Sequence, residues 1–242
     1  MPAPLAVVGA MHEEIAALLP CLTDGRVLTR GGREFHRGRL DGHEVILTRS
    51  GIGKVAAAAT CAILLDAFEA SAVLFTGVAG GLGPGVRVGD IVVATSLLQH
   101  DMDASPLFPR WEVPLTGRSA FDTDPRWTAR VAGACRGLLA SHARLAASTV
   151  HLGLVVSGDR FVATSAESRR LSIELPLALA VEMEGAALAQ VCRDFGRPCA
   201  VMRTISDRAD DAAHGDFQRF LREVAAPVSR DLVRATLAHD AD

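Results

Sequence analysis

The sequence contains no tyrosine, and aromatic residues make up only 5% of its 242 positions. So few aromatic side chains argue against a surface that recognises carbohydrate or antigen by stacking. Long apolar runs are also missing, because none reaches the roughly 20 residues that a helix needs to cross a bilayer. We therefore expect a soluble protein with no membrane partner.

Cysteine is scarce and odd in number, and no two cysteines form a CxxC pair. The five are Cys21, Cys61, Cys135, Cys192 and Cys199. This pattern argues against a disulfide framework or a zinc knuckle and favours a reducing, cytoplasmic location. No basic leader precedes the apolar run 5–8, so we expect a core strand there rather than a signal peptide.

Charge of neither sign is in large excess, since 25 Lys and Arg stand against 28 Asp and Glu, a formal net charge of −3. A broad attraction to phosphate backbones is not expected, which makes nucleic acid an improbable partner. The length, with 49% hydrophobic residues, suits one compact domain. We expect residues 1–242 to form that single domain.

Short β-branched runs alternate with longer alanine-rich segments, which is typical of helices that cover a mainly parallel or mixed sheet. The predicted fold class is therefore α/β. Expected strands are 5–8, 35–40, 44–49, 72–76, 91–96, 150–156, 177–181 and 200–205. Expected helices are 13–19, 54–68, 128–140, 165–174, 183–195 and 217–239. Asp41-Gly42 is the strongest hairpin signal, between the second and third strands.

Glycine-rich segments give weaker signals. The segment 51–54 lacks the spacing and the Ser/Thr of a phosphate loop. The segment 77–85 lacks the acidic residue that completes a dinucleotide site, so a tight turn at the sheet edge and a ligand-binding loop both stay open. The proline-bearing segment 99–124 is predicted to be a long excursion, and excursions of that length are usually functional.

Carboxylates follow three of the expected strands. They are Glu13, Glu14, Glu182, Glu184 and Asp207. Each alone is more often a helix N-terminal charge stabilised by the backbone dipole, the preferred reading for Glu13. Together they favour a site in which carboxyl groups divide acid and base duties, as enzymes that cleave glycosidic bonds require.

Seven strings, in order along nearly the whole chain, carry a family resemblance. They are GAMHEE (9–14), SGIGKVAA (50–57), TGVAGGL (76–82), VGDI (88–91), VSGDRF (156–161), VEME (181–184) and ISD (205–207). In these strings the chain resembles the 5′-methylthioadenosine/S-adenosylhomocysteine nucleosidases of the purine nucleoside phosphorylase superfamily. The resemblance implies a three-layer α/β/α fold with a central mixed, twisted sheet, and a hydrolase that releases adenine from these nucleosides.

Cleavage of an N-glycosidic bond leaves a cation-like ribosyl carbon and an anionic purine, so it needs an acid and a water nucleophile. The resemblance implies that Asp207 is the acid at purine N7, with a pKa raised by burial beside residues such as Ile205. It implies that Glu14 orients and deprotonates the water. Glu182 is expected beside the water, in support of Glu14.

The resemblance also implies a substrate-binding set. Glu184 would accept hydrogen bonds from the ribose hydroxyls, Met183 would lie against the sugar, and Ser206 would hold the acid. Phe161 would stack on adenine, although an isolated aromatic is more often core, and the backbone of Val162 would bind the base edge.

An apolar slot for the 5′ substituent is implied at Met11, Ile52 and Phe217. In relatives the neighbouring subunit completes this slot with its excursion, which here would fall within 102–114. A homodimer follows from the resemblance alone.

Two departures from the family pattern stand out. Val78 replaces a serine, which removes a hydroxyl from the water or ribose side. The stretch 100–110 differs from the best-known members, which leaves the choice of 5′ substituent open. His100, Asp101 and Asp103 within it could mimic a metal cluster, but we expect no metal and no cofactor, since the reaction needs none.

Three rival functions remain. A nucleoside phosphorylase needs a basic phosphate pocket, yet Phe75 stands where such enzymes tend to place an arginine. A futalosine or aminodeoxyfutalosine hydrolase would share the same acid, base and ribose contacts. A non-catalytic nucleoside binder is disfavoured by the intact set of Glu14, Glu184 and Asp207.

Overall fold

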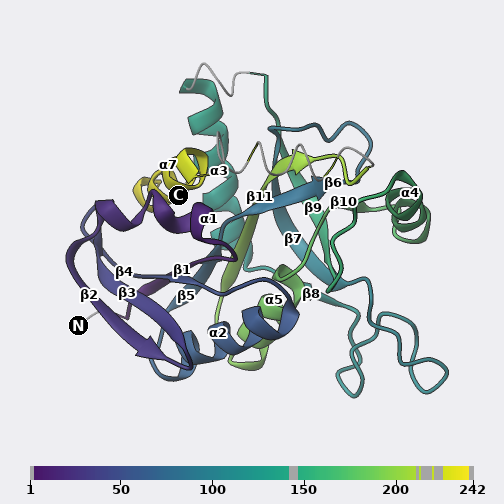
Figure 1. The fold of residues 1–242 in the computed structure, drawn as a ribbon, viewed down its shortest axis with the longest axis horizontal. Coiled ribbons are helices and arrows are strands. Elements are labelled where there is room, and N and C mark those ends of the chain that lie inside the picture. The colour runs from purple at the N-terminus through teal and green to yellow at the C-terminus, as the bar shows by residue number, and fades with distance from the viewer. Residues whose placement is uncertain (1–2, 142–146, 211–212, 214–219, 221–225, 240–242) are drawn as a thin grey trace.

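The computed structural model describes residues 3–141, 147–210, 213, 220 and 226–239, and its strands form one eleven-stranded sheet (Figure 1). The strands are β1 Leu5–Gly9, β2 Thr23–Arg30, β3 Arg33–Leu40, β4 His43–Arg49, β5 Ala72–Phe75, β6 Val78–Gly81, β7 Ile91–Gln99, β8 Ala120–Asp122, β9 Val150–Ser157, β10 Ala178–Glu182 and β11 Cys199–Asp207. The helices are α1 His12–Ala16, α2 Lys54–Asp66, α3 Pro125–Ser141, α4 Ser165–Glu174, α5 Gly185–Asp194 and α7 Ala226–Ala238, with the 3₁₀ helix η1 at Leu19–Cys21.

Strand β11 joins the two parts of the sheet. Its first half pairs in parallel with β5, in the register Ala200↔Leu74, and its second half pairs in parallel with β6, in the register Ile205↔Ala79. Its middle also pairs antiparallel with β7. Because β6, β10, β9 and β7 are neighbours in the same sheet, this last pairing closes that part of the sheet on itself.

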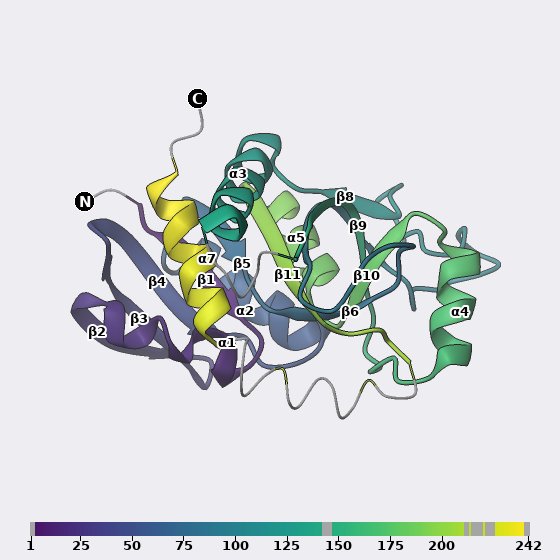
Figure 2. The same ribbon diagram turned by 90° about the horizontal axis from the view of Figure 1, so that it is seen from above.

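Apolar side chains point alternately to the two faces of the sheet, as the two-residue period of a strand requires. In β1, Ala6 and Val8 join the core cluster under α2 and α5, whereas Leu5 and Val7 join the cluster under α3 and α7. Figure 1 shows the two helix pairs on opposite sides of the sheet, and in Figure 2, seen from above, α7 lies in front of it. The predicted three-layer α/β/α fold is therefore confirmed.

Most predicted elements agree with the structure. The hairpin turns at Asp41 and Gly42, whose φ values of 50° and 85° are those of a two-residue turn. The first helix is shorter than predicted, because α1 ends at Ala16 and Pro20 lies in the separate helix η1. The beginning of the predicted helix 217–239 lies outside the described residues.

Three strands were not predicted. Strand β2 is mostly exposed and polar, so it has no core face that a hydrophobic pattern could reveal. Strand β8 is a three-residue piece inside the 99–124 excursion. Strand β6 lies inside the glycine-rich segment 77–85, so that segment is not simply a turn at the sheet edge.

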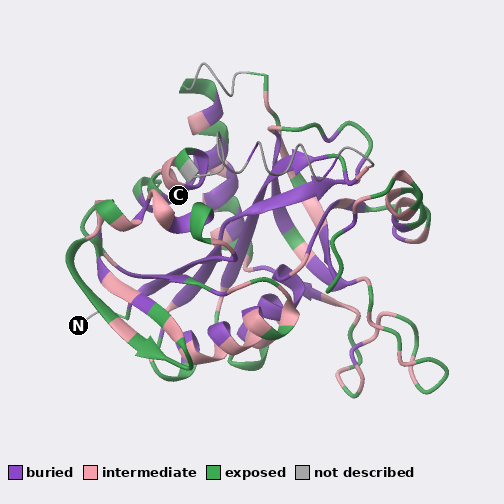
Figure 3. Ribbon diagram, in the orientation of Figure 1, coloured by how far each residue is buried: buried purple, intermediate pink, exposed green. Residues whose placement is uncertain are grey.

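The strands that carry the predicted site residues are mostly buried, whereas strand β2 at the periphery is mostly exposed (Figure 3). All nine residues of β11 are buried, including the charged Arg203 and Asp207. None of the described helices is long and apolar enough to cross a bilayer.

We predict that Leu64→Ala in α2 lowers the free energy of unfolding by about 2–5 kcal/mol, because it leaves a cavity between α2 and the sheet. Leu64 is fully buried in the cluster that α2 and α5 cover. The matched control is Leu177→Ala, the same substitution at a side chain that is 78% exposed, which should cost no more than about 0.5 kcal/mol. Urea unfolding of both variants measures the difference, and equal losses would contradict it.

Candidate active site

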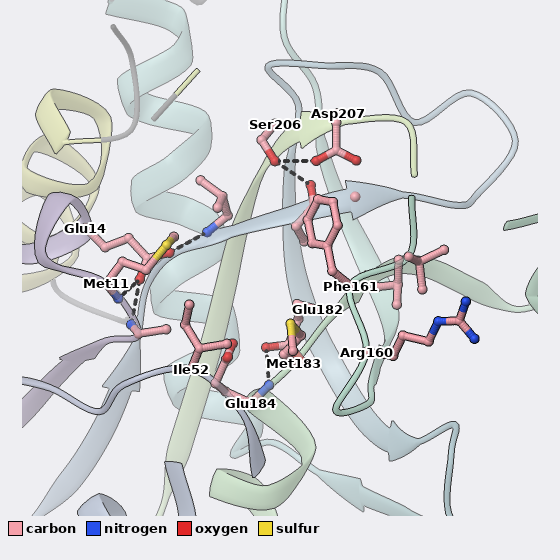
Figure 4. A pocket seen from close by; sticks show the side chains of 16 residues that line it. Met11, Glu14, Ile52, Arg160, Phe161, Glu182, Met183, Glu184, Ser206 and Asp207 are labelled. Atoms are coloured by element: carbon pink, nitrogen blue, oxygen red, sulfur yellow. Dashed lines mark hydrogen bonds between the residues drawn. The ribbon is translucent and has the colours of Figure 1, made fainter. Parts of the chain in front are cut away.

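A pocket of about 350 Å³ lies where β1, β10 and β11 end (Figure 4). Its walls combine carboxylates from three strand ends with apolar side chains. They include Ala10, Met11, Glu14, Ile52, Val78, Ala79, Gly80, Arg160, Phe161, Val162, Val181, Glu182, Met183, Glu184, Ser206 and Asp207. The structure therefore brings Glu14, Glu184 and Asp207 into one cavity. Glu13 does not line it and lies exposed in the first turn of α1.

Glu14 is 3% exposed and is held by backbone donors. Its Oε2 accepts from the backbone N–H of Ala10 and, at 2.9 Å, of Met11, while Oε1 accepts from Val78 N at 3.1 Å. A Cβ at Gly77 would lie 2.6 Å from Oε1, so only glycine admits the carboxylate there. Burial raises the pKa of Glu14, and the charge of Arg203 and these N–H donors oppose the rise.

Glu182 forms a fully buried ion pair with Arg203, with 2.8 Å between Oε2 and Nη2. The same carboxylate accepts from Ser157 Oγ and from the backbone N–H of Gly185 at the start of α5. Three kinds of protein donor therefore hold Glu182, and a role beside the water stays a prediction. Arg203 was not among the predicted site residues. An arginine inside the apolar strand AVMRTIS nevertheless indicates a buried, charged partner.

Glu184 is 6% exposed, and its Oε1 accepts from Gly53 N at 2.8 Å. This bond ties the loop before α2 to the start of α5. Burial, followed by the charge of Glu182, raises the pKa of Glu184 to about 8. A group that titrates near neutrality can accept or donate hydrogen bonds within the pocket.

Asp207 is 2% exposed at the end of β11. Its Oδ2 accepts from Ser206 Oγ at 2.8 Å, and its Oδ1 accepts from Ala209 N at 2.8 Å. Both oxygens are thus oriented by neighbours in the chain, and the role of Ser206 in holding the acid stays a prediction.

The apolar members of the predicted set line the same cavity. Phe161 is 38% exposed and Ile52 is 58% exposed, whereas Val162 and Val78 are buried. Val78 lines the pocket and donates its backbone N–H to Glu14. Phe217 lies outside the described residues.

Asp101 and Asp103, near the start of the excursion, are bonded to other groups of the protein. Asp101 Oδ1 pairs with Lys54 Nζ at 2.6 Å, and Asp101 Oδ2 accepts from Asp159 N at 2.9 Å. Asp103 instead accepts from Ser105 N in its own loop, at 3.0 Å. Within the described part of the chain, no three His, Cys, Asp or Glu residues are arranged to hold a metal ion.

Comparison with known proteins agrees with this geometry. The model of the phosphorylase superfamily matches residues 4–238. The 5′-methylthioadenosine/S-adenosylhomocysteine nucleosidase of Actinobacillus succinogenes is 37% identical over 97% of this chain and 98% of its own. The crystal structure of such a nucleosidase from Colwellia psychrerythraea, in complex with adenine, has a TM-score of 0.90 at 35% identity, covering 98% of this chain and 96% of that one.

A futalosine hydrolase of Helicobacter pylori is also similar, with a TM-score of 0.87 at 34% identity over 97% of each chain. Near-complete coverage on both sides, at well over 30% identity, shows the family as well as the fold. The chain belongs to the 5′-methylthioadenosine/S-adenosylhomocysteine nucleosidase family, within the phosphorylase superfamily.

Proposed function

We propose that this protein hydrolyses the N-glycosidic bond of 5′-methylthioadenosine and of S-adenosylhomocysteine and releases adenine. The observation that carries the proposal is the placement of Glu14 and Asp207 on separate sides of one pocket, with Glu184 lining the same pocket (Figure 4). One carboxyl group can then act on the base while the other acts on water.

The acid step is assigned to Asp207. Its protonated carboxyl group donates to purine N7, and the electrons of the glycosidic bond pass to the departing adenine. The bonds from Ser206 and Ala209 hold the carboxyl group in one orientation, so little reorganisation is needed when the proton moves. Phe161 and the backbone of Val162 are assigned to the adenine ring, which the apolar wall around them would accept.

The water step is assigned to Glu14. A carboxylate has about four acceptor positions. Three are filled by the N–H groups of Ala10, Met11 and Val78, which leaves one for a water molecule at the anomeric carbon. Glu184 and Met183 are assigned to the ribose, the first to its hydroxyls and the second to its face, and Met11 and Ile52 to the 5′ substituent.

Phosphorolysis is the weaker alternative because, among the described residues, the two arginines in or next to the pocket are already paired with carboxylates. The guanidinium of Arg203 is bonded to Glu182 and lies 4.0 Å from the ring centroid of Phe75. Arg160 is paired with Glu167 at 2.5 Å, and its side chain is 76% exposed. A phosphate would also approach the carboxylate of Glu14.

We further propose that residues 1–242 form one nucleoside phosphorylase-like domain that acts in the cytoplasm, in methionine salvage, as a homodimer. The family model spans residues 4–238, and all five cysteines are free thiols, which suits a reducing compartment. Ile52 at the pocket mouth and Leu107 and Leu115 in the excursion are more than half exposed, which supports cover by a second copy.

Hydrolysis is tested by following free adenine in phosphate-free buffer. We expect release from 5′-methylthioadenosine and S-adenosylhomocysteine without phosphate, because Glu14 supplies the nucleophile from water. Release that appears only after phosphate is added would show a phosphorylase. A preference for futalosine in the same nucleoside panel would show the alternative hydrolase, and no release from any nucleoside would show a binder.

Asp207→Asn should lower kcat by at least about 10²-fold, the usual scale for general acid catalysis, because an amide cannot donate the proton to N7. Substrate binding, measured by calorimetry, should be retained. The matched control Asp194→Asn changes an exposed carboxylate at the end of α5 and should leave kcat unchanged. An Asp207→Asn variant with wild-type turnover would remove Asp207 from the acid role.

The raised pKa of Glu184 predicts a pH-dependent stability. Its folded value of about 8 lies above the ordinary 4.5, so the folded protein binds this proton more tightly than the unfolded chain. The resulting stabilisation is fully present below pH 4.5 and is lost as the pH rises through about 8. The Tm of the ligand-free protein should fall across this window.

Glu184→Gln should flatten that fall, although not abolish it, since the pKa of Glu14 is raised by burial as well. The control Glu69→Gln alters an exposed carboxylate and should keep the wild-type slope. Thermal unfolding across the window measures all three proteins, and an unchanged slope in Glu184→Gln would contradict the assignment.

A further inference from the structure

A second, larger cavity adjoins the active site. It is a groove of about 1040 Å³ that shares Ala10, Met11 and Ile52 with the pocket. Two of these shared residues, Met11 and Ile52, form the wall assigned to the 5′ substituent. The groove therefore begins where the 5′ end of a bound nucleoside would leave the pocket.

The groove is lined by charges of both signs in equal number, whereas the charged residues of the pocket are carboxylates apart from Arg160. Its charged lining residues come from α1, β3 and the end of β4, and they are Glu13, Arg33, Glu34 and Arg49. Two histidines, His12 and His36, also line it, and His36 Nε2 lies 3.6 Å from Glu34 Oε2. A groove of this kind suits a ligand group that carries both a positive and a negative charge.

Arg33 has unused hydrogen-bonding capacity. Its Nη1 donates to Gly31 O at 2.9 Å, but its Nε is buried and has no hydrogen-bond partner among the described residues. Neither Arg33 nor Arg49 forms an ion pair with a carboxylate in the described part of the chain. The side chain of Arg33 lines the groove, and a ligand carboxylate can bind a guanidinium through two oxygens.

We propose that this groove binds the amino-acid end of S-adenosylhomocysteine. The α-carboxylate of the homocysteinyl group binds Arg33, with Arg49 beside it, and the α-ammonium group faces Glu13 and Glu34. The proposal rests on the proposed function, and it assigns to that function a subsite for a zwitterionic 5′ substituent.

The two substrates differ in whether they reach this subsite. The methylthio group of 5′-methylthioadenosine ends at the wall formed by Met11 and Ile52 and carries no charge. The homocysteinyl group continues from the same sulfur by a chain that ends in one ammonium and one carboxylate. Loss of a groove charge should therefore change the binding of one substrate and leave the other as an internal control.

The experiment compares Arg33→Gln with wild type on both substrates. We expect the KM for S-adenosylhomocysteine to rise about 10-fold, the scale of one hydrogen bond to a charged group, with kcat unchanged because the contact is the same in the ground and transition states. Both parameters for 5′-methylthioadenosine should stay at the wild-type level, which also shows that the variant is folded. The control Arg37→Gln, on the same strand but outside the groove, should change neither substrate.

A substrate analogue completes the test. The 5′-(3-aminopropylthio) derivative of adenosine keeps the ammonium group and lacks the carboxylate, so its KM should not respond to Arg33→Gln. A KM for S-adenosylhomocysteine that stays at the wild-type level in Arg33→Gln, or an equal rise for all three substrates, would overturn the subsite. Failure of the proposed function is seen separately, as wild-type protein that releases no adenine from 5′-methylthioadenosine.

Discussion

The buried ion pair between Arg203 and Glu182 is the constraint on which the site depends. Two charges far from water cost several kcal/mol each unless they are paired and hydrogen-bonded. Here Arg203 also donates to the carbonyl of Met202, and Glu182 caps the start of α5, so both groups are satisfied by protein. Strand β11 and the loop after β10 are thereby fixed to each other, and they carry Asp207 and Glu184.

The same pair sets the electrostatics of the pocket. The charge of Arg203 opposes the rise in the pKa of Glu14, while the charge of Glu182 adds to the rise caused by burial at Glu184. Burial raises the pKa of both carboxyl groups, and the charge of Arg203 counteracts the rise at each of them.

The pocket and the adjoining groove divide the recognition of a ligand between them. The pocket is small and mostly apolar apart from its carboxylates, which suits a nucleoside whose base and sugar must be desolvated. The groove is larger, open and charged, which suits a group that keeps part of its hydration. Met11 and Ile52 belong to both cavities, so the boundary between them lies at the 5′ position.

The sequence by itself determined the α/β class, the Asp41-Gly42 hairpin, most helices and the carboxylates at strand ends, because these depend on local periodicity and turn chemistry. It did not reveal β6, whose glycines are set by close approach to distant side chains, or the partner of Arg203, because Glu182 lies 21 positions away. The charged groove was equally hidden, since α1, β3 and the end of β4 meet only in the folded protein. Burial and pairing between distant segments are properties of the tertiary structure, and they decide which of these charges can do chemistry.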